Sequence, residues 1–255
     1  MTSATPRVPV VGGNWKMNTT RAEAQALLRD LRTRLDGLRG VEVVICPPAA
    51  WLGDAADLLG GSRLVVAAQN VYWEPKGAFT GEVSAPMLAG TATAVLIGHS
   101  ERRHVFGETD EDTNRKLRAV LDAGLRPVLA IGELREEAEG GRTEAVLRRQ
   151  LTGAFEGLDA LPADLVVAYE PVWAIGTGVA ATADDAQERC AMVRAILAER
   201  FDRVAADACR IQYGGSVNAQ NAAGYAACPD VDGVLVGGAS LDGASFEAIC
   251  RAFAA

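Results

Sequence analysis

Residues 165–201 read LVVAYEPVWAIGTGVAATADDAQERCAMVRAILAERF and contain one complete strand and helix unit. The first five residues are a continuous, largely apolar run, which is typical of a parallel strand buried on both faces. After a glycine-containing loop, Thr182 and Asp185 make a capping-box pattern, and apolar residues then recur every three or four positions. The stretch therefore predicts a buried strand followed by an amphipathic helix.

The same signals recur along the whole chain. Two more capping-box patterns, Thr20 with Glu23 and Thr109 with Asp112, mark further helix starts. Eight such units without a linker-like break predict an α/β fold, a (β/α)8 barrel that forms one catalytic domain. That domain spans residues 8–255, and residues 1–7 are predicted to be a flexible N-terminal extension. The predicted strands are Val8–Val11, Val41–Cys46, Leu64–Ala68, Ala94–Ile97, Pro127–Ile131, Leu165–Tyr169, Arg210–Tyr213 and Gly233–Val236.

Composition narrows the class of protein. Hydrophobic residues make up 49% and charged residues 23% of the chain, which excludes a disordered protein. No apolar run reaches the roughly 18 residues of a membrane span, and residues 1–7 lack the apolar block of a signal peptide. We therefore expect a cytoplasmic protein without a membrane partner. The net charge of -8 argues against a nucleic acid partner, and five cysteines without a C-x-x-C pair favour buried thiols in a reducing compartment.

Polar residues that follow the strands are the first candidates for function, because barrels of this kind carry their chemistry at the carboxyl ends of the strands. Lys16 follows the first strand and could place a compact ammonium against an anion. His99 ends the fourth strand, where the start of a helical turn would favour neutral imidazole. Glu170 follows the sixth strand, and partial burial there would raise the pKa of its carboxyl and make it a usable base. A solvated lysine, a structural histidine and a hydrated glutamate are the alternatives.

Consecutive glycines follow the last two strands, at 214–215 and 237–238. Glycine lets backbone N–H groups approach an oxyanion closely, and many barrels bind phosphate at this corner, so the pattern predicts a phosphate site without basic side chains. Residues 171–178 combine a proline, bulky apolar residues and two glycines, which is typical of a lid that moves as a unit. A dinucleotide site at 176–181 is disfavoured, because its glycines do not directly follow the strand.

Five stretches resemble signatures of the triosephosphate isomerase family, in the same order along the chain. They are GNWKMN at 13–18, GHSERR at 98–103, YEPVWAIGTG at 169–178, YGGSV at 213–217 and GVLVGGAS at 233–240. The resemblance extends from about residue 8 to the C-terminus. It implies the reversible interconversion of dihydroxyacetone phosphate and glyceraldehyde 3-phosphate through an enediolate, in glycolysis and gluconeogenesis, with no cofactor and no metal.

The resemblance also implies a role for each candidate residue. Glu170 would be the base, and neutral His99 would polarise the carbonyl and move protons between the two substrate oxygens. Lys16 and Asn14 would stabilise the enediolate charge and orient the substrate, while Glu101 would position the histidine. The phosphate would be bound by the backbone around Gly176, Ser216, Gly237 and Gly238.

The family further implies a homodimer. Residues 69–82 form a long predicted loop with aromatic residues, similar to a family loop that reaches into the partner subunit. Thr80 would then lie near the partner's Asn14 and the partner's Lys16. A loop packed against its own subunit is the alternative. Ala130 stands where the family often has cysteine, and this difference is expected to change reactivity toward thiol reagents rather than catalysis.

Two other functions fit parts of the pattern. A lyase or aldolase of sugar phosphates would share the glycine pairs, but an aldolase needs a Schiff-base lysine inside the barrel. The three lysines, Lys16, Lys76 and Lys116, are predicted just past a strand, in a loop and in a helix. A non-catalytic phosphate-binding protein would not require Glu170, His99 and Lys16 at three separate strand ends.

Overall fold

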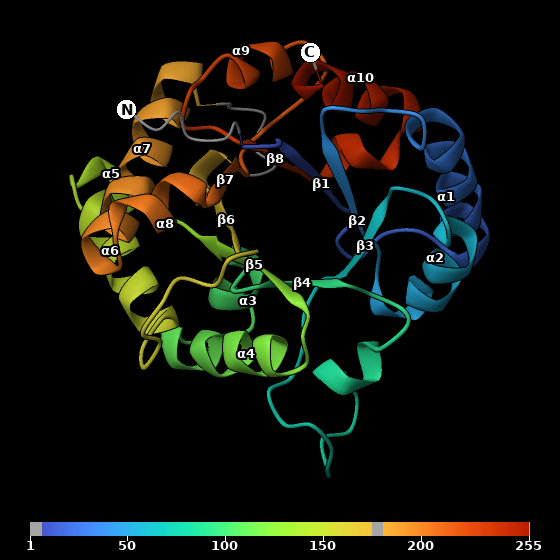
Figure 1. Ribbon diagram of the computed structural model, residues 1–255, viewed down its shortest axis with the longest axis horizontal. Coiled ribbons are helices and arrows are strands. Elements are labelled where there is room, and N and C mark those ends of the chain that lie inside the picture. Colours follow the sequence, from blue (N-terminus) through green and yellow to red (C-terminus); the bar gives the residue numbers. More distant parts are fainter. Residues whose placement is uncertain (1–6, 175–180, 255) are drawn as a thin grey trace.

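The computed structural model of the chain describes residues 7–174 and 181–254. Eight strands close into a barrel in sequence order, and each strand lies parallel to its neighbours. Figure 1 looks along this barrel and shows the helices as an outer ring. The predicted (β/α)8 architecture is confirmed.

The strands lie where the apolar runs predicted them, with ends that differ by a few residues. The strands are β1 (Val10–Asn14), β2 (Glu42–Cys46), β3 (Val65–Ala68), β4 (Ala94–Ile97), β5 (Arg126–Ile131), β6 (Val166–Tyr169), β7 (Arg210–Tyr213) and β8 (Gly233–Val236). The α-helices are α1 (Arg21–Leu35), α2 (Leu52–Leu59), α3 (Ser100–His104), α4 (Asp110–Asp122), α5 (Arg135–Glu139), α6 (Thr143–Ala154), α7 (Ala183–Arg200), α8 (Arg203–Ala208), α9 (Ala222–Ala226) and α10 (Gly243–Phe253). Short 3-10 helices span Ala49–Trp51, Ala85–Leu88, Val172–Ala174 and Gly238–Leu241.

Three of the longer helices begin at the predicted capping boxes. The side chains of Thr20, Thr109 and Thr182 each accept a hydrogen bond from the backbone of the third helical residue, whose carboxylate returns a bond to the cap. These bonds satisfy N–H groups that have no partner inside the helix, at a value of about 1 kcal/mol per cap. The helix starts at α1, α4 and α7 are therefore set by local sequence.

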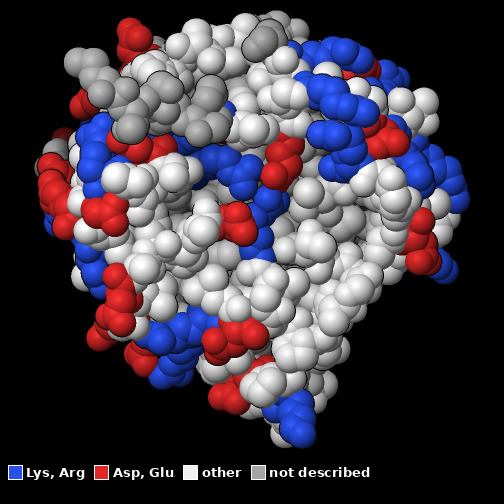
Figure 2. Space-filling view, in the orientation of Figure 1, with Lys and Arg blue, Asp and Glu red and all other residues white. Residues whose placement is uncertain are grey.

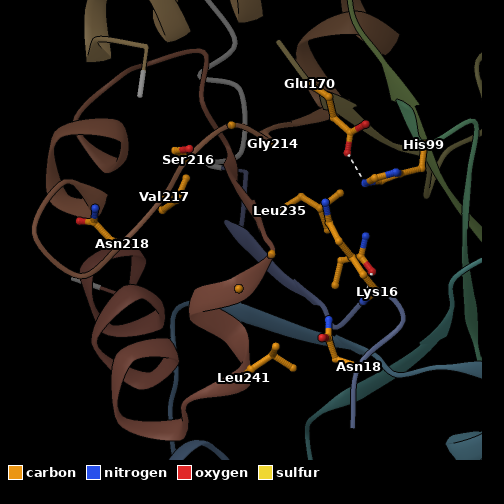
Figure 3. Close-up of a pocket in the computed structure, with 14 residues that line it drawn as sticks. Lys16, Asn18, His99, Glu170, Gly214, Ser216, Val217, Asn218, Leu235 and Leu241 are labelled. Carbon is orange, nitrogen blue, oxygen red and sulfur yellow. Dashed lines mark hydrogen bonds and ion pairs between the residues drawn. The ribbon is translucent and has the colours of Figure 1, made fainter. Parts of the chain in front are cut away.

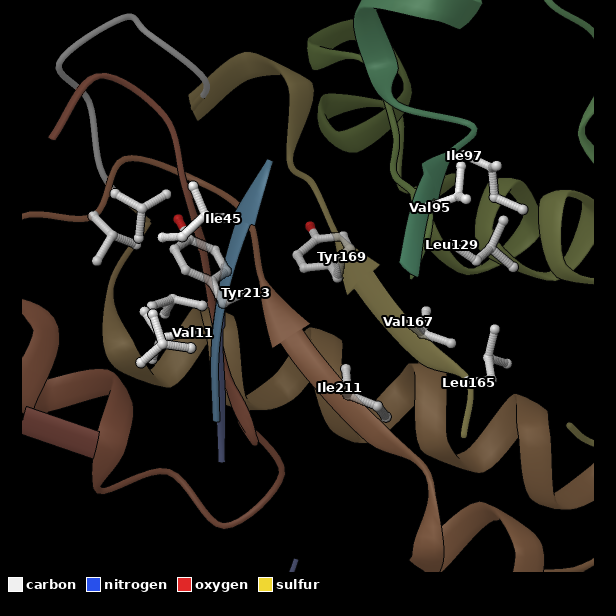
Figure 4. Close-up of a cluster of buried hydrophobic side chains, with 14 of the residues drawn as sticks. Val11, Ile45, Val95, Ile97, Leu129, Leu165, Val167, Tyr169, Ile211 and Tyr213 are labelled. Atoms are coloured by element: carbon white, nitrogen blue, oxygen red, sulfur yellow. The ribbon is translucent and has the colours of Figure 1, made fainter. Parts of the chain in front are cut away.

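On every strand except β7, alternate residues belong to two separate apolar clusters. On β6, Val166 and Ala168 pack with residues that fill the barrel, while Val167 and Tyr169 pack toward the surrounding helices (Figure 4). Strand side chains alternate between faces, so both faces of β6 are buried. This explains why the strands read as continuous apolar runs instead of alternating patterns.

The start of the described chain is anchored. Arg7 was predicted to belong to the flexible extension. Its Nε donates to Asp232 at 2.5 Å, and its Nη1 and Nη2 donate to the backbone carbonyls of Asp207 and Pro229 at 2.9 and 2.8 Å. Residues 1–6 lie outside the described residues, and their flexibility stays a prediction. Within the described ranges, no helix is long and apolar enough to cross a bilayer.

Candidate active site

A cavity of about 420 Å³ opens at the carboxyl ends of the strands (Figure 3). Its polar wall comes from separate strand ends, with Asn14 on β1, His99 after β4 and Glu170 after β6. The lining residues Asn14 and Leu241 are 227 positions apart in sequence, so distant parts of the chain share one cavity. The full lining is Asn14, Lys16, Asn18, His99, Glu170, Gly214, Gly215, Ser216, Val217, Asn218, Leu235, Gly237, Gly238 and Leu241.

His99 and Glu170 point toward each other (Figure 3). Nε2 of His99 lies 3.1 Å from Oε1 of Glu170, and Oε2 of Glu170 accepts the backbone N–H of Ser100 at 3.0 Å. The backbone N–H of Glu101, at the start of α3, donates to Nδ1 of His99 at 3.2 Å. Because Nδ1 is an acceptor, the ring proton belongs on Nε2, where it donates to Glu170. This hydrogen-bond pattern is that of an imidazole that carries its proton on Nε2 and is bonded to a carboxylate. The neutral state of His99 stays a prediction.

Opposing influences set the pKa values of this pair. Burial raises the pKa of Glu170, but His99 and the Ser100 amide outweigh it, and the pKa lies below its usual value. Burial lowers the pKa of His99, but attraction to Glu170 outweighs it in turn and raises that pKa. The expectation of a raised pKa for Glu170 is therefore wrong while the carboxylate contacts the imidazole. A substrate that separates the two side chains would remove their mutual attraction and leave burial as the larger influence.

Lys16 has a left-handed backbone conformation, with φ of 52°. Such a conformation costs a residue with a Cβ roughly 1–2 kcal/mol, so neighbouring groups must hold it. Oδ1 of Asn14 accepts the Lys16 N–H at 3.0 Å, and Nε2 of Gln69 donates to the Lys16 carbonyl at 3.0 Å. The ammonium that these bonds support lies 2.7 Å from Oε1 of Glu101.

Glycines give Glu170 its space. A Cβ on Gly214 would lie only 2.8 Å from Cγ of Glu170, and a Cβ on Gly132 would overlap the backbone carbonyl of Glu170. On the other side of the cavity, Gly237 and Gly238 lie at the start of a 3-10 helix that follows β8. A Cβ on Gly238 would meet no atom within 4 Å. The first two glycines are therefore needed for packing against the glutamate. Of the last pair, Gly238 leaves open space beside the backbone, whereas a Cβ on Gly237 would lie 3.6 Å from Cε of Lys16.

The structure brings most of the sequence-predicted residues together. Asn14, Lys16, His99, Glu170, Ser216 and both late glycines line the cavity, and the hydroxyl of Ser216 donates to the Ala174 carbonyl at 2.6 Å. Glu101 lies at the edge, 46% exposed, between Lys16 and the imidazole. Thr80 is exposed on the loop that projects from the barrel at the lower edge of Figure 1 and does not line this cavity. Gly176 and the second half of the predicted lid lie outside the described residues.

Sequence reasoning missed a buried carboxylate next to this site. Glu133 follows β5 and is 1% exposed, and its Oε1 accepts the Tyr169 hydroxyl at 3.0 Å and the Trp173 indole N–H at 3.2 Å. Burial raises the pKa of this carboxyl above its usual value. The signal was available, because Glu133 follows the end of β5 after one glycine, and Glu170 follows the end of β6 directly. Through Trp173 it holds the start of the segment that follows β6.

The arrangement has the parts needed for proton transfer next to a carbonyl. It combines a buried carboxylate, an imidazole with a proton on Nε2, an ammonium and the backbone of Gly237 and Gly238. The carboxylate and the imidazole can supply general base and general acid chemistry. Among residues 7–174 and 181–254, no cluster of three or more His, Cys, Asp or Glu side chains could hold a metal ion.

Comparisons with known proteins agree with this geometry. The family model described as triosephosphate isomerase matches residues 9–253. The triosephosphate isomerase of Symbiobacterium thermophilum is 54% identical over 250 residues, which cover 97% of this chain and 98% of the relative. That of Citrifermentans bemidjiense is 50% identical over 247 residues, which cover 96% of this chain and 98% of the relative. The crystal structure of triosephosphate isomerase from Bartonella henselae superimposes with a TM-score of 0.87 at 37% identity, covering 96% of this chain and 99% of that one. The chain therefore belongs to the triosephosphate isomerase family.

Proposed function

We propose that this cavity is where the chain interconverts dihydroxyacetone phosphate and glyceraldehyde 3-phosphate, by proton transfer through an enediolate. Family membership supports this reaction and its place in glycolysis. One observation carries the assignment of the site, namely that Glu170, His99 and Lys16 come from three strand ends and line one cavity. We further propose that residues 8–255 are the single catalytic domain and that the reaction needs no cofactor.

Glu170 is the proposed base. Its carboxylate is buried beside the cavity, and burial favours a basic carboxylate once neighbouring donors are removed. Both oxygens are engaged, Oε1 with His99 and Oε2 with Ser100. To reach a substrate carbon the carboxylate must exchange these bonds, so we expect it to move when substrate occupies the cavity.

His99 is the proposed electrophile. Its Nε2 proton can donate to the substrate carbonyl in place of Glu170, and the Glu101 amide at Nδ1 keeps the ring neutral. A neutral imidazole can give a proton to one substrate oxygen and take one from the other without first losing a positive charge. Lys16, with its backbone held by Asn14, places an ammonium where the enediolate charge develops.

The phosphate is proposed to bind at the corner formed by the loops after β7 and β8. Ser216, Gly237 and Gly238 line this corner, and open backbone there allows N–H groups to approach an oxyanion. Gly176 joins this set from the family resemblance alone. Since one positioned acid or base contributes about 10²- to 10⁴-fold, electrostatic stabilisation of the intermediate is expected to supply the larger share of the rate.

The aldolase alternative has less support. Only Lys16 among the three lysines lines the cavity. Lys116 is buried on α4 and pairs with Glu108 and Asn70, and Lys76 is exposed in the projecting loop. A Schiff-base role would fall to Lys16, whose ammonium is already paired with Glu101.

A coupled isomerase assay on the purified protein tests the proposed function, with a chelator present to test metal independence. We expect turnover of glyceraldehyde 3-phosphate by the wild type, and a loss of kcat by orders of magnitude in Glu170→Asp and His99→Gln with folding intact. Near-wild-type turnover by both folded variants would reject these roles. Loss of wild-type activity with chelator would reject metal independence.

We propose that the chain works as a homodimer in the cytoplasm. Met17 and Phe106 line a shallow pocket together with Lys16, and they are 96% and 65% exposed in the single chain. Large apolar side chains exposed close together are typical of an interface. The projecting loop that carries Thr80 is the segment expected to reach the partner. Sedimentation equilibrium should give twice the chain mass of 26.7 kDa, and a monomer with full activity would contradict the proposal.

A further inference from the structure

The opposite end of the barrel, where the strands begin, holds a second cavity of about 550 Å³. The first residues of four strands line it, and three of them are charged: Glu42 of β2, Arg126 of β5 and Arg210 of β7. Among the described residues, none lines both this cavity and the catalytic one. Figure 2 looks onto this end of the barrel and shows basic and acidic side chains meeting near its centre.

The three charged side chains form the floor of the barrel. Val44 and Val128, two residues further along β2 and β5, belong to the cluster that fills the barrel. Because strand side chains alternate between faces, Glu42 and Arg126 face inward as well. Their side chains are 25% and 15% exposed, and that of Arg210 is 16% exposed. A charged layer therefore closes the barrel where an apolar layer would otherwise lie.

Glu42 links the two arginines. Its Oε1 forms an ion pair with Nη1 of Arg126 but has no hydrogen-bond partner among the described residues. Its Oε2 accepts Nη1 of Arg210 at 3.1 Å. One carboxylate thus faces two guanidinium groups, which leaves one positive charge without a counterpart in this layer. Asp164, the other acidic residue at this cavity, is exposed at its rim, where water screens its charge.

Arg126 has an unused hydrogen-bonding edge. Its Nε and Nη2 atoms are buried and have no hydrogen-bond partner in the described part of the chain. On a guanidinium these two nitrogens make the planar fork that binds a carboxylate or a phosphate through two parallel bonds. A buried donor without a partner is unfavourable, because it has lost its hydrogen bonds to water. A ligand that accepts from both atoms would restore those bonds.

We propose that the floor of the barrel is an oxyanion-binding site, in which the Nε and Nη2 edge of Arg126 binds a carboxylate or phosphate group of a small ligand. Arg210 supplies the second positive charge, and Glu42 keeps the two guanidinium groups in place. Binding requires Arg126 to turn its unpaired edge into the cavity while Nη1 keeps Glu42. This site does not rest on the proposed isomerase function, because it lies at the other end of the strands.

Two probes test the site, inorganic phosphate and malonate. Titration calorimetry on the wild type should resolve two phosphate sites, the first in the catalytic cavity and the second at the floor of the barrel. In NMR spectra, the Nε–H resonance of Arg126 should shift as phosphate fills the second site. Arg126→Met should lose the second site and keep isomerase kcat, KM and competitive inhibition by phosphate. Arg126→Lys keeps the charge but lacks the fork, and it should bind at least about tenfold more weakly.

The outcomes separate clearly. Binding of malonate alone at Arg126 would identify a carboxylate ligand, binding of phosphate alone would identify a phosphate ligand, and both results support the site. A single phosphate site in the wild type and no shift at Arg126 with either probe would overturn the proposal, as would undiminished second-site binding in a folded Arg126→Met. Because phosphate inhibition of turnover reports the catalytic cavity separately, failure here is distinguishable from failure of the isomerase assignment.

Discussion

Replacing Gly214 by alanine should displace the proposed base without unfolding the protein. The new Cβ would lie 2.8 Å from Cγ of Glu170, whereas carbon atoms rest about 3.5 Å apart or more. The glutamate must therefore move by about 0.7 Å, since the backbone at Tyr169 limits movement of the alanine on the other side at 3.3 Å. A misplacement of about 1 Å can cost about 10²-fold in rate, so we expect kcat to fall by about 10- to 100-fold.

The assay is the coupled isomerase reaction, with thermal unfolding recorded on the same sample. Overpacking costs about 1–3 kcal/mol, which is less than the about 5–15 kcal/mol that holds a domain folded. Gly53→Ala is the matched control, because a Cβ at this helical position meets no atom within 4 Å. It should leave kcat unchanged and raise stability by up to about 1 kcal/mol.

The result that would refute the reasoning is an unchanged kcat in folded Gly214→Ala. It would mean that the rate does not depend on where the Glu170 carboxylate lies. A fall in kcat that also appeared in Gly53→Ala would equally remove the argument, because the effect would then follow from glycine replacement in general and not from contact with the base.

Three further predictions concern stability and reactivity. The pKa of Glu170 lies below its usual 4.5, so its contribution to stability is complete above that pH and is lost as the pH falls through the folded-state pKa. In His99→Gln burial is the larger influence on this pKa, so urea unfolding between pH 3 and about 6 should show a smaller loss of stability toward acid pH. A pH profile identical to that of the wild type would contradict this. Arg194→Met leaves Asp230 and Asp232 without their buried partner and should cost about 3–5 kcal/mol. Arg203→Met, at an exposed pair with Asp207, should change the urea midpoint much less, because water screens that pair. Equal urea midpoints for the two variants would be inconsistent with the difference in burial. Burial raises the pKa of Cys46 to about 12. Of the five cysteines only Cys228 is half-buried, and the other four are buried, so a thiol reagent should modify at most one cysteine in the native protein and all five after denaturation. Rapid modification of several thiols in the native protein would contradict this prediction.

Much of the fold was predictable because its signals are local. A helix start depends on a threonine and an acidic residue three positions later, as at Thr182 and Asp185, and these residues meet whatever the rest of the chain does. A strand buried on both faces needs a continuous apolar run, as in 165–169, and the alternation of helix and strand then limits the topology to few choices. The candidate residues Lys16, His99 and Glu170 could be found for the same reason, since each lies within a few residues of the end of such a run.

The sequence could not predict the pKa of Glu170 or the contacts of Arg7, because both depend on atoms that come together from distant positions in the chain. The pKa of Glu170 lies below its usual value because His99, 71 positions earlier, reaches its carboxylate at 3.1 Å, and burial alone predicts the opposite direction. Arg7 was expected to be mobile, yet it is held by Asp232, 225 positions away.

The charged floor of Glu42, Arg126 and Arg210 also joins three separate strand starts. Sequence by itself determined the strands, the helix starts and which polar residues follow the strands, because those depend on neighbours along the chain. Only the closed barrel decided the charges and partners of those residues, because electrostatic and hydrogen-bond energies depend on distances in space that closure of the sheet sets.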